Sequence, residues 1–169
     1  MSVIASITKC MIAYPGSTRH DAAHLLKVWA YAKSIGELEG LDAKTQLTLE
    51  IAALTHDIAC PLCRQKYGST AAALQEKEGA PLARTLLEDF PLDTEVVDRV
   101  AFLVTHHHTL DAIDGMDYQI LIESDYLVNA DESRYSPESI LAFHFQHFKT
   151  QSGKDMLLSL FPGIGLDEK

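Results

Sequence analysis

Apolar residues recur along the chain at the three- and four-residue spacing of helix faces, and short breakers separate one run from the next. The first predicted helices are residues 1–13, a segment capped by Ser17 or Thr18 that stops near Gly36 to Gly40, and a segment from Asp42 to His56-Asp57. Residues 71–89 are predicted to form one helix, or two short ones around Gly79-Ala80-Pro81, and the next helix runs from Asp93 into His106-His107-His108. The last three predicted helices are a segment through 120–127, a segment opened by Ser136-Pro137-Glu138, and about 152–161. Alternation of β-branched with polar residues is scarce, so we predict no strand.

Two stretches are predicted to be loops. Pro61 forbids simple continuation of the preceding helix, so residues 60–70 are expected to be irregular, and residues 109–115 are polar. The pattern therefore predicts an all-α fold, a compact bundle of about seven to nine helices without significant sheet. We expect one domain over residues 1–169, with a core in 17–130 and C-terminal helices within 136–161 packed on it.

Composition narrows the classes of function. The formal net charge is −10, and such a surface repels nucleic-acid backbones and anionic membranes, although it does not exclude a small phosphorylated molecule. No apolar run approaches the ~20 residues that span a bilayer, and the first residues lack the basic start of a secretion signal. We therefore expect a cytoplasmic monomer or homodimer that binds neither nucleic-acid polymers nor membranes.

The most informative chemical feature is the adjacent pair His56-Asp57 at the end of an apolar helix. An imidazole and a carboxylate together suit a divalent transition metal, but the pair alone is also explained by Asp57 capping the turn and bonding to His56. His24 lies on the preceding helix, and Asp125 lies in the apolar run ILIESDYLV. Asp125 either faces solvent or is a buried carboxylate, which needs a compensating cation.

Two further clusters of metal-capable residues stand nearby in the sequence. His106, His107 and His108 follow an apolar helix, and since three consecutive side chains cannot all face the core, at least one is expected in solvent. Cys60 and Cys63 form a Cys-x-x-Cys, but a zinc site needs further soft ligands and a redox motif needs a βαβ setting. Coincidence is the simplest interpretation, and a place at the rim of a pocket is the alternative.

The order His24, His56-Asp57, Asp125 resembles the HD-domain superfamily of metal-dependent phosphohydrolases. The segment HDAAHLLKVWAYA is similar to the first helix of that family, LEIAALTHDIA to the end of its signature helix, and LIESDYLVN to its final ligand helix. The segment KYGSTAAALQEKEGAPLARTLLED resembles the helix after the signature in a bacterial subgroup. The resemblance covers roughly residues 17–130.

The resemblance implies that His24, His56, Asp57 and Asp125 are ligands of one divalent metal, for which nickel, cobalt, manganese, iron, zinc and magnesium are all candidates. His20 lies one turn before His24 and is expected in the outer shell or in solvent. The metal would lower the pKa of a bound water and polarise a phosphoryl oxygen. The implied substrate is a phosphate ester of a nucleotide or a related small molecule, with Asp57 as ligand and proton acceptor.

Some members of the superfamily hold a second metal, using one more His after the signature helix and two on the next helix. His106 and His107 match the latter positions, but Gln75 stands at the former, with Glu76 and Glu78 nearby. These residues either complete a second metal site or line the pocket beside the first. In the latter case His106, His107 or Glu76 would support the metal ligands from outside, or act as general acid and phosphate binder, and Glu76 is the expected second catalytic residue.

A second departure follows the signature, where Ala59-Cys60 replaces the Gly-Lys of many members. Arg64 and Lys66 in the expected loop, and Arg19 before the first ligand, are candidates for binding the substrate phosphate. Exposed loop bases are more often simply solvated.

Three functions remain in competition. The first is a phosphohydrolase that uses metal-activated water. The second is a di-iron oxygenase of the same superfamily, against which Gln75 counts because that chemistry needs the fuller ligand set. The third is a metal-binding regulatory module with little turnover, against which the complete set of four ligand types counts.

Overall fold

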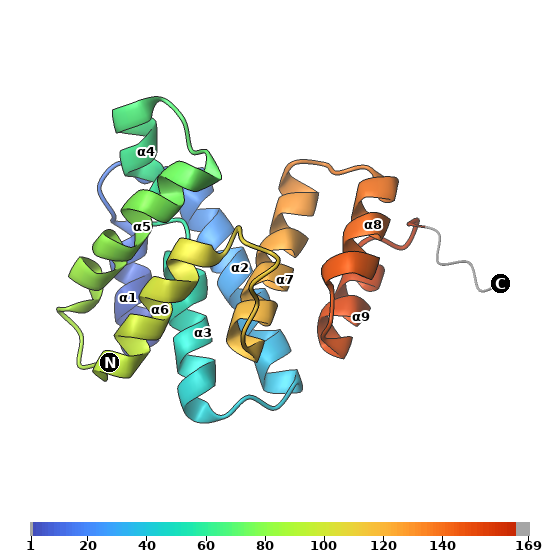
Figure 1. Ribbon diagram of the computed structural model, residues 1–169, viewed down its shortest axis with the longest axis horizontal. Coiled ribbons are helices and arrows are strands. Elements are labelled where there is room, and N and C mark those ends of the chain that lie inside the picture. Colours follow the sequence, from blue (N-terminus) through green and yellow to red (C-terminus); the bar gives the residue numbers. More distant parts are fainter. Residues whose placement is uncertain (1, 165–169) are drawn as a thin grey trace.

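The computed structural model describes residues 2–164, and all of its regular structure in that range is helical (Figure 1). The described residues form nine helices: α1 (Val3–Ile12), α2 (Arg19–Leu38), α3 (Ala43–Thr55), α4 (Cys60–Tyr67), α5 (Ala72–Leu87), α6 (Thr94–His106), α7 (Met116–Glu132), α8 (Pro137–His147) and α9 (Gln151–Leu160). The predicted all-α class is confirmed. None of these helices is long and apolar enough to cross a membrane.

Capping side chains start three of the helices where the sequence predicts a start. At α2 the Thr18 hydroxyl accepts a hydrogen bond from the Asp21 backbone N–H while the Asp21 carboxylate accepts one from the Thr18 N–H, which is a capping box. Asp42 caps α3, and Ser136 caps α8 with Pro137 in its first turn. The left-handed turn that follows α2 is made at Gly40, where φ is +74°.

Two helices are buried around their circumference and form the centre of the bundle. Every residue of Thr48–Thr55 in α3 is buried, and so is every residue of 117–124 in α7. A helix without a solvent face must be covered by neighbours on all sides. α2 packs on both α3 and α7, and α6 packs on α3. The helices that carry His24, His56-Asp57 and Asp125 are therefore in mutual contact.

The predicted loop at residues 60–70 is wrong in its first part, because Cys60–Tyr67 forms the helix α4. The preceding helix α3 already ends at Thr55, before Pro61 is reached. Pro61 occupies the first turn of a new helix, where the backbone N–H that proline lacks would have no partner within the helix. α4 ends at Gly68, whose φ of +66° is left-handed. Residues 72–87, for which one helix or two were predicted, form the single helix α5 with Pro81 inside it.

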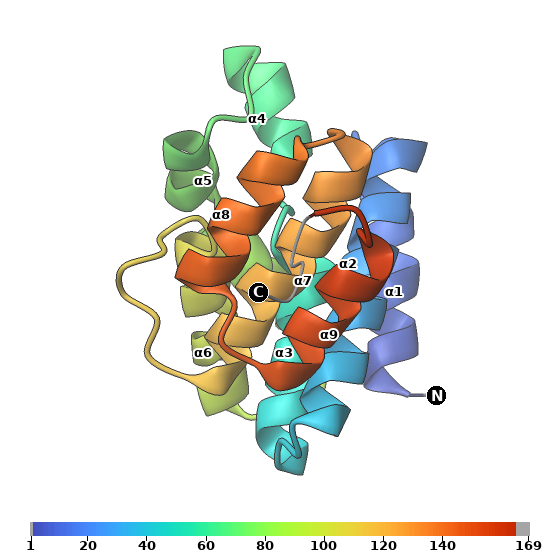
Figure 2. The ribbon, with the colours of Figure 1, turned by 90° about the vertical axis from the view of Figure 1, so that its right-hand side faces the viewer.

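The C-terminal helices pack on α7 through a buried carboxylate. Glu123 of α7 is fully buried and accepts hydrogen bonds from the backbone N–H groups of Lys149 (2.6 Å) and Thr150 (3.0 Å), from the Thr150 hydroxyl and from the Gln119 amide. Figure 2 shows α8 and α9 covering this side of the bundle. Glu123 thus joins the start of α9 to the helix that carries Asp125.

Candidate metal centre

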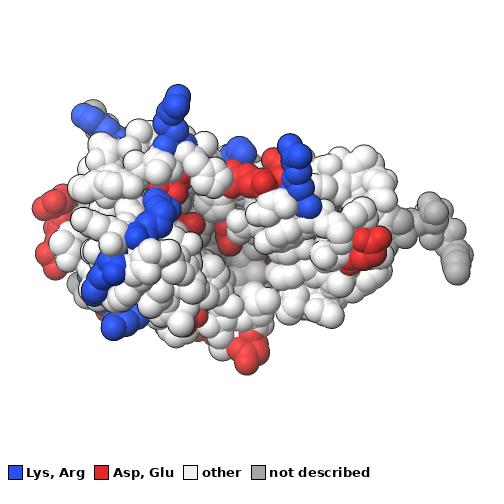
Figure 3. All heavy atoms as spheres, turned by 90° about the horizontal axis from the view of Figure 1, so that it is seen from above, with Lys and Arg blue, Asp and Glu red and all other residues white. Residues whose placement is uncertain are grey.

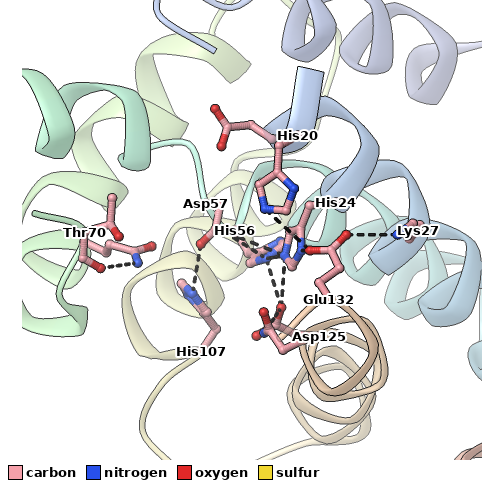
Figure 4. A network of polar contacts seen from close by, with 12 residues as sticks. His20, His24, Lys27, His56, Asp57, Thr70, His107, Asp125 and Glu132 are labelled. Atoms are coloured by element: carbon pink, nitrogen blue, oxygen red, sulfur yellow. Dashed lines mark hydrogen bonds and ion pairs between the residues drawn. The ribbon is translucent and has the colours of Figure 1, made fainter. Parts of the chain in front are cut away.

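Four side chains from three packed segments converge beside the end of α3 (Figure 4). The Nε2 atoms of His24 and His56 lie 3.3 Å apart, and Oδ1 of Asp125 lies 3.2 Å from the first and 3.4 Å from the second. Oδ2 of Asp57 lies 3.8 Å and 3.7 Å from the same two nitrogens. The structure therefore brings together all four residues that the sequence puts forward as ligands.

Hydrogen bonds on the far side of each imidazole determine which nitrogen faces the cluster. Nδ1 of His24 lies 3.0 Å from a carboxylate oxygen of Glu132, and Nδ1 of His56 lies 2.9 Å from the backbone carbonyl of Ala53. Carboxylate and carbonyl oxygens only accept, so both Nδ1 atoms carry the proton. The neutral rings then point their Nε2 lone pairs at each other and at the oxygens of Asp57 and Asp125.

This arrangement of acceptors fits a cation. His24 and His56 have only 7% and 1% of their side-chain surface exposed, whereas Asp57 is 25% exposed, so the cluster is open to solvent on the side of Asp57. One ligand atom each from His24, His56 and Asp57 lies within 4.8 Å of the other two, a spacing that a single ion can bridge. Imidazole nitrogen and carboxylate oxygen are ligands that divalent transition metals accept.

The same geometry shifts the pKa values of the cluster. Burial opposes protonation of His56, but the charge of Asp57 and the hydrogen bond to Asp125 outweigh it and raise the pKa of His56 to about 9. Burial acts to lower the pKa of His24, but the hydrogen bond to Asp125 and the charges of Asp125 and Asp57 together raise it. Burial acts to raise the pKa of the Asp57 and Asp125 carboxyls, yet the adjoining histidines hold both below their usual range. A metal must displace protons from this cluster to bind.

A second group of ligand atoms shares Asp57. Oδ1 of Asp57 lies 3.6 Å from Nε2 of His107, and Asp57, His107 and His108 form a further set within 4.8 Å. His107 is 3% exposed and donates through Nδ1 to the Val104 carbonyl at 2.8 Å. Its Nε2 is buried without a hydrogen-bond partner among the described residues. An unpaired buried acceptor is costly, and a cation beside Asp57 would satisfy it.

The expected pair His106-His107 is corrected to His107-His108. The His106 ring turns away from Asp57: its Nδ1 donates to the Phe102 carbonyl at 2.8 Å, and the ring stacks on Phe102 with centroids 4.2 Å apart. α6 ends at His106, and His107 and His108 lie in the turn that follows it, so their rings need not share the direction of the His106 ring. His108 lies against His107 with ring centroids 3.9 Å apart and remains partly in solvent.

The acidic and amide residues of α5 do not join either ligand group. Gln75 is buried and donates to the Thr70 carbonyl at 2.8 Å, while its Oε1 has no hydrogen-bond partner within residues 2–164. Glu78 accepts from Lys66 at 2.9 Å and from the Tyr67 hydroxyl at 2.6 Å. Glu76 accepts a weak hydrogen bond from Thr109 at 3.4 Å. A catalytic role for Glu76 stays a prediction.

The three candidate phosphate-binding bases differ in position. Arg64 is held by Asp21 at the first turn of α2, with Nη1 3.2 Å from Oδ1 and Nη2 on Oδ2. Lys66 is engaged by Glu78, and Arg19 is exposed at the start of α2. Of these three bases, Arg64 is the one that contacts a residue lining the opening of the metal centre, through its ion pair with Asp21.

Sequence reasoning missed two residues that hold the ligands in place. Glu132 binds His24 as described and also accepts from Lys27 at 3.0 Å, and the Asn129 amide donates to Oδ1 of Asp125 at 2.8 Å. Both lie on the face of α7 that carries Asp125, four and seven residues after it, so helical spacing is the signal that identifies them. His20 has 71% of its side chain exposed and lies 3.6 Å from Glu132, in the outer position expected for it.

A small pocket of about 190 Å3 opens onto the cluster. Its lining includes His20, Asp21, His24, Asp57 and, from α7 and its end, Asn129, Glu132 and Ser133. Viewed from above, the molecule has a hollow with acidic side chains beside it and Lys and Arg side chains around it (Figure 3). Mixed charge of this kind suits a cation together with a small anion.

The two cysteines after the signature are free and buried thiols. Burial raises the pKa of both, and the charge of Asp57 raises that of Cys60 further. Nucleophilic and redox-active cysteines need a lowered pKa and access to solvent. These thiols have neither property, which agrees with the interpretation of the Cys-x-x-Cys as coincidence.

Comparisons with known proteins agree with the site. The family model of the HD domain matches residues 21–145, a span that contains His24, His56, Asp57 and Asp125. Comparisons with curated proteins and with solved structures gave no match. Because the family match extends over well more than half of the chain and includes all four converging side chains, the protein belongs to the HD-domain family.

Proposed function

We propose that the protein is a metal-dependent phosphohydrolase that cleaves a phosphate ester of a nucleotide or a related small molecule. The observation that carries the proposal is the convergence of two imidazole Nε2 atoms and two carboxylates in one buried cluster. HD-domain proteins are mostly metal-dependent hydrolases, which supports the same reaction class. The opening beside Asp57 supplies the access that substrate and water need.

The residues of the cluster and their neighbours have different proposed roles, which follow from their positions. His24, His56, Asp57 and Asp125 would hold one divalent metal, which when bound acidifies water and polarises a phosphoryl oxygen. Glu132 and the Ala53 carbonyl fix the orientation of the two imidazoles. Asp57 is the most exposed of the four ligands at 25%, so it is the group proposed to accept the proton of the attacking water.

The test combines metal content with phosphate release. The purified protein is assayed for bound metal and then, with each candidate divalent ion, for phosphate release from a panel of nucleotides and small phosphate esters. We expect Asp57→Asn to lose at least about a hundredfold in rate and to bind metal more weakly. Asp98→Asn is the matched control, because Asp98 is an exposed acid paired with Arg84 on another face. Absence of both metal binding and release from every ester in the panel would refute the proposal.

The second group around Asp57 favours one alternative, a di-iron oxygenase. His107 and His108 offer the extra ligands that a second ion needs, whereas Gln75 makes no contact with that group. Two equivalents of iron per chain with oxygen consumption would support this alternative. Tight binding of one metal with neither oxygen consumption nor phosphate release would support a regulatory module.

A further inference from the structure

A larger hollow lies beside α4, next to the metal centre. Its volume is about 760 Å3, and its walls are the turn between α1 and α2 with Tyr14 and Pro15, the first turns of α4 with Pro61 and Leu62, and Leu82 of α5. The wall side chains are mostly apolar, and Tyr14 adds an aromatic ring. The chemistry proposed at Asp57 does not use this hollow.

Residues that line the hollow contact residues of the metal centre. Arg64 lines the hollow, and its guanidinium binds the carboxylate of Asp21, which lines the opening of the metal centre. Pro61 of the hollow follows Cys60, whose backbone N–H donates to the Asp57 carbonyl at 2.9 Å. The Arg64–Asp21 ion pair and the turn before α4 therefore lie where the two spaces approach each other.

Their volumes fit two parts of one molecule. Pockets that enclose small organic ligands measure about 300–1,000 Å3, a range that includes the hollow but not the opening at the metal, which is about 190 Å3. The smaller space is large enough for a phosphate group. The apolar walls and the Tyr14 ring match a flat, largely apolar organic group.

We propose that the hollow lined by Tyr14, Leu62 and Leu82 holds the organic group of the ester while its phosphate lies at the metal centre. The inference rests on the proposed function and assigns the substrate class, a phosphomonoester of a bulky aromatic alcohol. Arg64 stands at the junction, where Asp21 holds its guanidinium and its other N–H groups can meet the phosphate or a polar substituent.

The test fills the hollow without touching the metal ligands. Leu62 is half-buried on α4, and Leu62→Trp occupies the space in front of it. Leu160→Trp is the matched control, since Leu160 is 44% exposed and lines separate hollows beside α9. Hydrolysis of 1-naphthyl phosphate and its inhibition by inorganic phosphate are measured for the metal-loaded wild type and both variants.

We expect Leu62→Trp to raise KM for 1-naphthyl phosphate about tenfold, the effect of losing several tens of Å2 of apolar contact. The inhibition constant of inorganic phosphate and all constants of Leu160→Trp should not change. Equal changes for 1-naphthyl phosphate and inorganic phosphate, or no change in either, would overturn the assignment of the hollow and leave the phosphohydrolase function standing.

Failure of the function itself gives a different result. If the wild type releases no phosphate from any ester, binding of 1-naphthyl phosphate to the metal-loaded protein is measured by calorimetry. Binding that is about tenfold weaker for Leu62→Trp but normal for Leu160→Trp then supports the hollow as a binding site. Equal binding by all three proteins refutes it.

Discussion

Glu132 offers a sharp test of how the metal centre is organised, because it acts on the ligands without being one of them. Its carboxylate accepts hydrogen bonds from Nδ1 of His24 at 3.0 Å and from Nζ of Lys27 at 3.0 Å, and its side chain is only 13% exposed. Glu132→Ala leaves the His24 N–H without its partner and frees the ring to rotate or to change tautomer. Glu132→Gln keeps an oxygen that can accept the bond but removes the charge.

The magnitude follows from the strength of one charge-assisted hydrogen bond. Such a bond contributes about 1.5–3 kcal/mol, and loss of an outer partner of a metal-binding histidine typically weakens metal affinity by about 10–100-fold. Glu132 is partly exposed, so we expect Glu132→Ala to weaken binding by about thirtyfold and Glu132→Gln by less than about tenfold. A larger loss of metal affinity in Glu132→Ala than in Glu132→Gln is the result that an orienting role predicts.

The assay is a competitive titration of cobalt or manganese against a chelator of known affinity. Asp131→Asn is the control, since Asp131 is the adjacent exposed acid and its replacement changes the net charge by the same amount without touching His24. If Glu132→Ala binds metal as tightly as Asp131→Asn does, Glu132 does not orient His24 and the reasoning fails.

Two further predictions concern pH and stability. The pKa of His56 is raised from 6.5 to about 9, and that of His24 is also raised. In the metal-free protein, the charged forms of these two rings therefore contribute their full stabilisation below pH 6.5, and this stabilisation is lost as the pH rises to about 9. Metal binding needs neutral rings, so the increase in Tm on adding metal should grow over the same interval, and calorimetry that finds it constant would contradict the assigned protonation. Glu123→Gln should lower the free energy of unfolding by about 2–3 kcal/mol, because the backbone N–H groups of Lys149 and Thr150 lose a charged acceptor. Urea denaturation measures the free energy of unfolding, and the control is Glu88→Gln at an exposed residue, which should change that free energy by less than about 0.5 kcal/mol. An unchanged denaturation midpoint for Glu123→Gln would exclude the role assigned to Glu123.

The helices and the first ligand set could be predicted from local signals. The spacing of apolar residues and the caps at Thr18, Asp42 and Ser136 involve only a few neighbouring residues, so they can be recognised in the sequence without knowledge of the fold. The error at α4 has a local cause as well, because Pro61 breaks a helix interior but is accommodated in a first turn. A proline alone does not distinguish a loop from a new helix.

The sequence by itself determined the all-α class, the order of the helices and the four residues His24, His56, Asp57 and Asp125, because these depend on residue type and near-neighbour spacing. Only the tertiary structure decided which side chains surround them. His108 rather than His106 accompanies His107 beside Asp57, because both lie in the turn after α6 while the His106 ring stacks on Phe102. Glu132 reaches His24 across 108 residues of sequence because α2 and α7 pack side by side, a contact that no local pattern encodes.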